Sequence, residues 1–132
     1  MITGLVWLNH TSLTDIPGTI EWDSDSALML TLIFEDEVGQ AKWCVGRDLF
    51  ADALRDGQAG EGDVHASCGM IKFSNMAWAS PSFNVTLTSP YGTVTLSTPL
   101  APVIQFMSET YTLVGRGEEN VDVDALIREL NL

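Results

Sequence analysis

Apolar and polar residues alternate along most of the first two thirds of the chain, a pattern typical of β-strands. This alternation predicts early strands at 2–8, 19–22, 28–34 and 41–45. In 28–34 both alternating positions are largely apolar, as expected for a strand that is covered on both faces. Between the strands lie turn-forming residues, at Asp15–Gly18, Asp23–Ser26 and 35–40.

The period of the apolar residues changes after Gly46. Leu49, Phe50, Ala53 and Leu54 have the spacing of one helix face, with Asp48 suited to the N-cap and Gly57 to the end of the helix. The glycine-rich residues 58–63 are expected to form a loop. A second set of strands is predicted at 64–68, 70–73 (with an extension toward 79), 83–88 and 93–97.

The longest helix is expected to follow, with Thr98 as N-cap and Pro99 at its first position. Its buried face is predicted to comprise Val103, Phe106, Met107 and Thr110, continued by Tyr111 and Leu113, and Gly115 should end it. Asp122 is suited to cap a last short helix that carries Leu126 and Leu130. The order of elements indicates one α+β domain, 1–132, with antiparallel β-sheets of about eight strands, a short middle helix and C-terminal helices.

Composition narrows the possible partners. Hydrophobic residues make up 45% of the 132-residue chain, so a packed core is expected. Against 18 acidic residues there are only 6 Lys and Arg, a net charge of -12. This charge disfavours nucleic acid, whose phosphates are bound mainly by Lys and Arg, and anionic lipid. With no apolar run long enough for a membrane span and no basic segment at the start, we expect a cytoplasmic protein that does not insert into membranes.

Residues that could support catalysis or bind a metal are few and scattered. Cys44 and Cys68 are expected to be reduced and buried. His65 and Cys68 are three positions apart in a predicted strand, which places them on opposite faces and disfavours a cysteine–histidine pair. His10 has no nearby partner in the sequence. We therefore predict no enzymatic activity, cofactor or metal, and a small hydrolase remains a minor alternative.

The four tryptophans, Trp7, Trp22, Trp43 and Trp78, carry more information, because tryptophan is enriched at protein interfaces. Most tryptophans belong to the core or its edge. Trp78 is the best candidate for a protein contact, since the surrounding residues 75–79 are largely apolar without clear alternation.

Several short motifs occur in an order that resembles the SsgA-like protein family, the SsgB-type sporulation and cell-division regulators of actinobacteria. They are Ile20–Asp23, Lys42–Phe50, Gly60–Val64, Leu87–Gly92 and Val121–Asp124. The family's Trp-x-Phe-Ala-Arg-Asp-Leu-Leu core is represented here by Trp43 to Phe50, with Val45 and Gly46 in place of Phe-Ala. The resemblance extends over roughly 12–132, and a divergent or actinophage-encoded member would have this pattern.

The resemblance implies a Whirly-like fold, a homotrimer and a non-enzymatic role. The resemblance implies that members act in septum-site selection through FtsZ or otherwise direct peptidoglycan remodelling, so FtsZ or another division protein is the expected partner. A phage-encoded structural or host-takeover protein is the alternative. Protein-binding candidates are Trp43, Arg47, Asp63 and Trp78; Arg47 is expected either to pair with Asp63 or to face a partner.

Overall fold

The computed structural model describes residues 2–36, 39–74 and 76–118, and it confirms the α+β class. The strands are β1 (Ile2–Asn9), β2 (Asp15–Glu21), β3 (Met29–Asp36), β4 (Gly39–Gly46), β5 (Gln58–Glu61), β6 (Val64–Ile71), β7 (Ser80–Ser89) and β8 (Gly92–Pro99). The helices are the short 3-10 helix η1 (Ser24–Ser26), α1 (Arg47–Asp56) and α2 (Leu100–Leu113).

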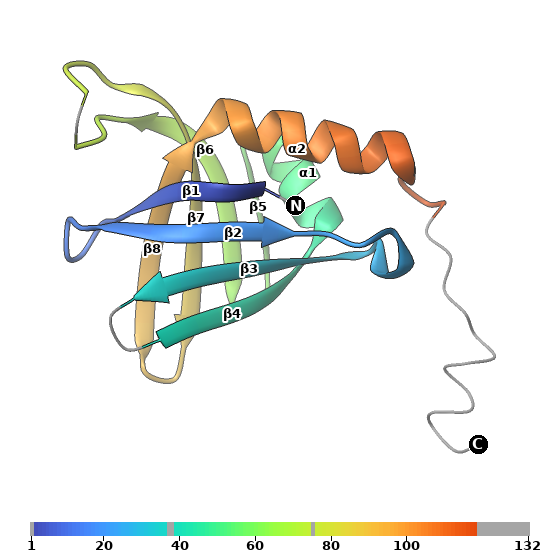
Figure 1. Ribbon diagram of the computed structural model, residues 1–132, viewed down its shortest axis with the longest axis horizontal. Coiled ribbons are helices and arrows are strands. Elements are labelled where there is room, and N and C mark those ends of the chain that lie inside the picture. The colour runs from blue at the N-terminus through green and yellow to red at the C-terminus, as the bar shows by residue number, and fades with distance from the viewer. Residues whose placement is uncertain (1, 37–38, 75, 119–132) are drawn as a thin grey trace.

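All eight strands form one antiparallel sheet in the order β4-β3-β2-β1-β8-β7-β6-β5. The sheet consists of two meanders, β1–β4 and β5–β8, and α1 connects them. In Figure 1 the β5–β8 half runs behind the β1–β4 half and across its strand direction, and α2 lies along the top. The sheet is thus strongly curled, and both helices pack within its curve.

The two halves meet along a short join between β1 and β8. Only Leu8 with Ser97 and Asn9 with Leu96 are paired there, whereas β7 and β8 are paired along eight positions from Ser82 with Pro99 to Ser89 with Gly92. Beyond the paired residues, the buried hydroxyl of Thr98 donates to the carbonyl of Val6 at 3.1 Å. A side chain therefore continues the join where the backbone ladder has stopped.

Both halves and both helices contribute to one hydrophobic core. Trp7 on β1 is fully buried, and its ring meets Phe34 edge-to-face at 5.5 Å between centroids. Phe50 on α1 meets Phe83 on β7 in the same way at 4.8 Å. Edge-to-face contacts of this kind add to the stabilisation from burial alone. The contact of Phe50 with Phe83 connects α1 to the β5–β8 half, and the contact of Trp7 with Phe34 stabilises the inner face of the β1–β4 half.

Several local predictions are wrong. Residues 58–61, expected in a loop, form β5, whose Ala59 is paired with Ala66 of β6. Thr98 and Pro99 belong to β8, so α2 begins at Leu100 without a side-chain cap, and it ends at Leu113, before Gly115. Leu113 is exposed rather than buried.

Other details at the ends of elements also differ from expectation. Gly46, not Asp48, is the N-cap of α1, although Gly57 ends the helix as predicted, with φ 89°. Cys44 is exposed, because it points away from the core on β4, which is an edge strand; Cys68 is half-buried. The short helix predicted from Asp122 lies outside the described residues. The buried face predicted for α2, Val103, Phe106, Met107 and Thr110, is confirmed.

Candidate protein-binding surface

Three motifs that lie far apart in the sequence meet at one end of the molecule. Trp43 on β4 is half-buried and lies beside the β7–β8 turn, where it shares a pocket of about 270 Å³ with Ser89, Tyr91 and Gly92. The backbone N–H of Thr88 donates to the carbonyl of Asp63 at 2.9 Å, which joins the β5–β6 turn to the same region. We call this region, formed by Trp43, Asp63, Ser89, Tyr91 and Gly92, the motif surface.

Backbone geometry explains why these turns have their sequences. Gly92 has φ 137° and Gly62 has φ 59°, values that side chains disfavour. The N–H of Tyr91 donates to the hydroxyl of Ser89 at 3.2 Å, a local bond typical of serine in turns. The result is a tight turn that leaves the Tyr91 ring 100% exposed beside Trp43. Tyr91 is a site residue that the sequence analysis did not single out.

Trp78 lies elsewhere, in the connection between β6 and β7. This connection projects from the body at the upper left of Figure 1. Trp78 is 82% exposed, and Met70 and Met76 nearby are exposed as well. The fold itself therefore does not bury this ring. Exposed aromatic and methionine side chains together are typical of protein contacts.

Arg47 is fully buried, so its side chain does not lie on the surface of this chain. Its Nη1 donates to the carbonyls of Thr110 at 3.1 Å and Val114 at 2.7 Å, at the end of α2. Its guanidinium lies 4.0 Å from the ring centroid of Tyr111 and 5.5 Å from that of Trp22. These contacts place the Arg47 guanidinium between the end of α2 and the two aromatic rings.

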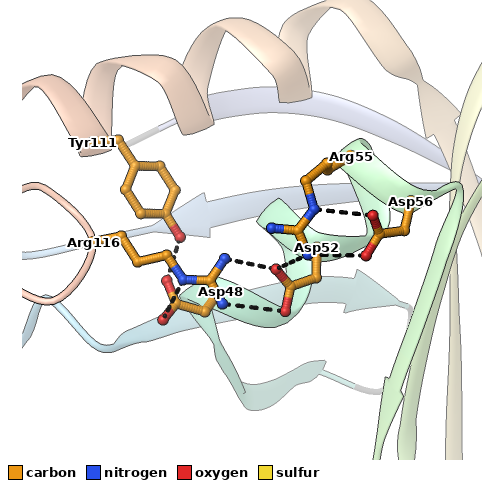
Figure 2. A network of polar contacts seen from close by, with 6 residues as sticks. All are labelled: Asp48, Asp52, Arg55, Asp56, Tyr111 and Arg116. Carbon is orange, nitrogen blue, oxygen red and sulfur yellow. Dashed lines mark hydrogen bonds and ion pairs between the residues drawn. The ribbon is translucent and has the colours of Figure 1, made fainter.

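A polar network beside Arg47 ties α1 to the end of α2 (Figure 2). The hydroxyl of Tyr111 donates to Asp48 at 2.6 Å, and Arg116 binds Asp52 through Nη1 at 2.7 Å. The hydrogen bond from Arg116 holds the pKa of Asp52 below its ordinary value. Burial, reinforced by the Asp48 carboxylate, raises the pKa of Tyr111. Asp48, which was expected to cap α1, instead accepts the hydrogen bond from Tyr111 of α2.

The curl of the sheet also brings together His10 and Ser97, 87 positions apart, with Nε2 and Oγ separated by 2.7 Å. A serine beside a histidine is the arrangement used by nucleophilic hydrolases. Here, however, the Ser97 hydroxyl donates to Oδ1 of Asn84 at 2.6 Å, and Ser97 is fully buried. Nε2 of His10 must therefore donate to Ser97 rather than accept its proton, so this pair lacks the proton acceptor that a nucleophile needs.

Cys68 is the other described side chain whose environment bears on nucleophilic catalysis. Burial raises the pKa of the Cys68 thiol, which disfavours the reactive thiolate. Across residues 2–36, 39–74 and 76–118, no group of three or more His, Cys, Asp or Glu could hold a metal ion. Within the same residues, no helix is long and apolar enough to cross a membrane.

Together, fold and surface define a small α+β protein whose tight turns and exposed aromatic rings suit protein contacts. The family model described as "Streptomyces sporulation and cell division protein, SsgA" matches residues 16–119. The chain therefore belongs to the SsgA family, as its sequence motifs indicated.

Individual relatives agree with this assignment. A sporulation-specific cell division protein SsgB from Salinispora tropica is 28% identical over 123 residues, covering 87% of this chain and 79% of the relative. The SsgB of Thermobifida fusca is 31% identical over 90 residues, covering 67% of this chain and 60% of the relative.

A solved structure from a study relating SsgB mutations to longitudinal cell division during sporulation of Streptomyces coelicolor has a similar fold. It superimposes with a TM-score of 0.74 at 23% identity, covering 87% of this chain and 86% of that one. At this identity the likeness concerns the fold, and it confirms the predicted architecture.

Proposed function

We propose that this chain is a non-enzymatic, protein-binding regulator of cell division that acts in septum-site selection through FtsZ or another division protein. The observation that carries the proposal is the family match over 16–119, together with relatives that are sporulation-specific cell division proteins. The net charge of -12 further favours a protein partner over nucleic acid. The expected site of action is the cytoplasm at the septum.

Two exposed regions supply the binding candidates. The motif surface presents Tyr91 beside half-buried Trp43, and the β6–β7 connection presents Trp78. Exposed tyrosine and tryptophan rings are frequent hot spots of protein interfaces, because they bury large areas with little loss of conformational entropy. A homotrimer is part of the proposal; analytical ultracentrifugation should then give the mass of three chains.

Co-sedimentation with polymerising actinobacterial FtsZ, with and without GTP, tests the partner. The protein should pellet only with polymer and should change the amount of polymer. If either ring is a binding hot spot, its replacement by alanine, Tyr91→Ala or Trp78→Ala, should reduce pelleting about ten-fold or more. Ile104→Ala is the matched control, because Ile104 is also an exposed apolar residue, on α2.

Two results would contradict this proposal in different ways. Absence of pelleting at every salt concentration would exclude direct action on FtsZ. Equal losses for Ile104→Ala and the ring variants would exclude both candidate surfaces. A phage-encoded structural or host-takeover role stays the alternative, which detection of the protein in purified virions would support.

A further inference from the structure

A hollow lies apart from the motif surface, between the β2–β3 connection and the end of α2. It has a volume of about 670 Å³ and is lined by Glu21, Trp22, Asp23, Met29 and Leu113, among others. Leu113 is 72% exposed and Met29 44% exposed, so apolar area on its walls faces solvent. We call this hollow the Trp22 groove.

The Trp22 ring, which forms the floor of the groove, is held in place by contacts with the Ala27 carbonyl and with Arg47. The indole N–H of Trp22 donates to the carbonyl of Ala27 at 3.0 Å, which fixes the ring against the η1 loop. The buried guanidinium of Arg47 lies against the same ring and also bonds the carbonyls of Thr110 and Val114. One side chain therefore positions both the aromatic floor and the helix end that carries Leu113. Such preorganisation lowers the entropic cost of binding.

Charge determines which ligands suit the Trp22 groove. Glu21 and Asp23 are exposed acids on its wall, and none of the described residues that line it is Lys or Arg. A purely apolar ligand would remove water from these carboxylates without offering a partner, which is unfavourable. A ligand that combines apolar side chains with Lys or Arg would cover Leu113 and Met29 and pair with the acids as well.

We propose that the Trp22 groove binds a short basic and apolar segment of a partner protein. This site lies outside the motif surface and does not depend on the proposed role in division. The chain's own segment 119–132 suits it poorly, because this segment carries four acidic residues and one Arg. A second copy of the chain offers few segments of this kind, since it has only 6 Lys and Arg among its 132 residues.

The test uses the full chain and a short fluorescein-labelled peptide of leucine, glycine and arginine. A twin peptide with glutamate in place of each arginine controls for charge, and one with serine in place of each leucine controls for apolar contact. Binding is followed by fluorescence anisotropy, and its location by the indole N–H resonances of the four tryptophans. Only the first peptide should bind well, and the Trp22 resonance should shift most.

Matched variants distinguish the groove from general attraction to an acidic protein. Glu21→Gln with Asp23→Asn should weaken binding about five- to ten-fold, the sum of two exposed charge pairs. Glu61→Gln with Asp15→Asn removes the same charge at two exposed positions outside the groove and the motif surface, and should leave affinity nearly unchanged. Leu113→Ser, at an exposed position, should weaken binding without unfolding the protein.

Each other outcome would overturn the proposal. Equal losses for the two double variants would mean non-specific electrostatic binding. A shift of the Trp43 or Trp78 resonance instead of Trp22 would place the peptide elsewhere. Displacement of the labelled peptide by a synthetic 119–132 peptide would assign the groove to the chain's own segment. Absence of binding by all three peptides would leave the groove without this ligand.

Discussion

Gly18 on β2 is the residue whose replacement the core should tolerate least. A Cβ at this position would lie 2.5 Å from both Cδ1 and Nε1 of the Trp7 ring. That ring is fully buried and packed against Phe34, so it cannot move aside freely. We expect Gly18→Ala to lower the free energy of unfolding by about 2–3 kcal/mol through overpacking.

Urea denaturation at one fixed protein concentration measures this loss. Gly46→Ala is the matched control, since the nearest atom to a Cβ there is 3.9 Å away and its φ is -66°, which alanine adopts readily. A Gly18→Ala variant as stable as Gly46→Ala would contradict the close approach of β2 to Trp7.

Arg47 illustrates how burial changes the role of a charged residue. Because Arg47 donates to the carbonyls of Thr110 and Val114, its loss would remove two hydrogen bonds at the end of α2 and the contact of its guanidinium with two aromatic rings. We expect Arg47→Met to cost about 3 kcal/mol of unfolding free energy. Arg55→Met removes the same group from an exposed site, with 63% side-chain exposure, and should cost at most about 0.5 kcal/mol. Similar losses in the two variants would contradict the buried role of Arg47.

At the scale of elements, we expect the contact between α1 and the segment that follows α2 to depend on pH. Because hydrogen bonding to Arg116 lowers the folded-state pKa of Asp52 below its ordinary 3.8, the ionised carboxylate stabilises the fold above that pH. The contribution is lost as the pH falls through the lowered pKa. Wild type should therefore be more stable than Arg116→Gln at neutral pH, and the difference should shrink toward zero in acid.

Thermal unfolding of both proteins from neutral pH to well below 3.8 measures this difference. The Arg55–Asp56 pair is present in both proteins, so its own acid sensitivity cancels. High salt should also reduce the difference, because the network is largely exposed to solvent. A stability difference that persists unchanged in acid would show that Asp52 is not the titrating partner of Arg116.

Elements with strong local patterns were predictable, and elements defined by pairing were not. The alternation of Phe83, Val85 and Leu87 predicted β7, and the helical spacing of Val103, Phe106 and Met107 predicted the buried face of α2. β5 has only four residues, two of them polar and one Gly, so its strand structure comes from pairing with β6. Likewise, Thr98 and Pro99 have the residue types of a helix start, but the join to β1 keeps Thr98 in a strand.

The candidate site was predicted only in part, for a reason at the scale of the whole molecule. Trp43 and Asp63 were identified from motifs, but Trp43 reaches Tyr91 only through the curl of the sheet. Asp63 lies in this region because β6 pairs with β7. Trp78 was chosen from the sequence as the tryptophan best suited to a protein contact, and its ring is exposed. The burial of Arg47 was missed, because its carbonyl partners lie 63 and 67 positions away, and backbone carbonyls leave no mark in a sequence.

The short join between β1 and β8 raises the question of whether the two halves unfold together. Since Trp7, Val85, Phe50 and Phe106 belong to one core, we expect a single transition despite the two paired positions of the join. Thr98→Val removes the buried bond to Val6 and should lower stability by about 1 kcal/mol. Thr95→Val removes a half-buried bond to Thr86 within the β5–β8 half and should cost less.

Two probes report separately on the halves in a Cys44→Ser background. Tryptophan fluorescence reports mainly on the β1–β4 half, because Trp78 is already 82% exposed in the folded state. Protection of Cys68 from a thiol reagent reports on the other half, where Cys68 lies half-buried with its thiol 3.6 Å from the carbonyl of Ala53 on α1. Both probes should give the same urea midpoint in the background protein, and Thr98→Val should shift both equally. Loss of Cys68 protection before the change in fluorescence would instead mean that the shared core does not couple the two halves.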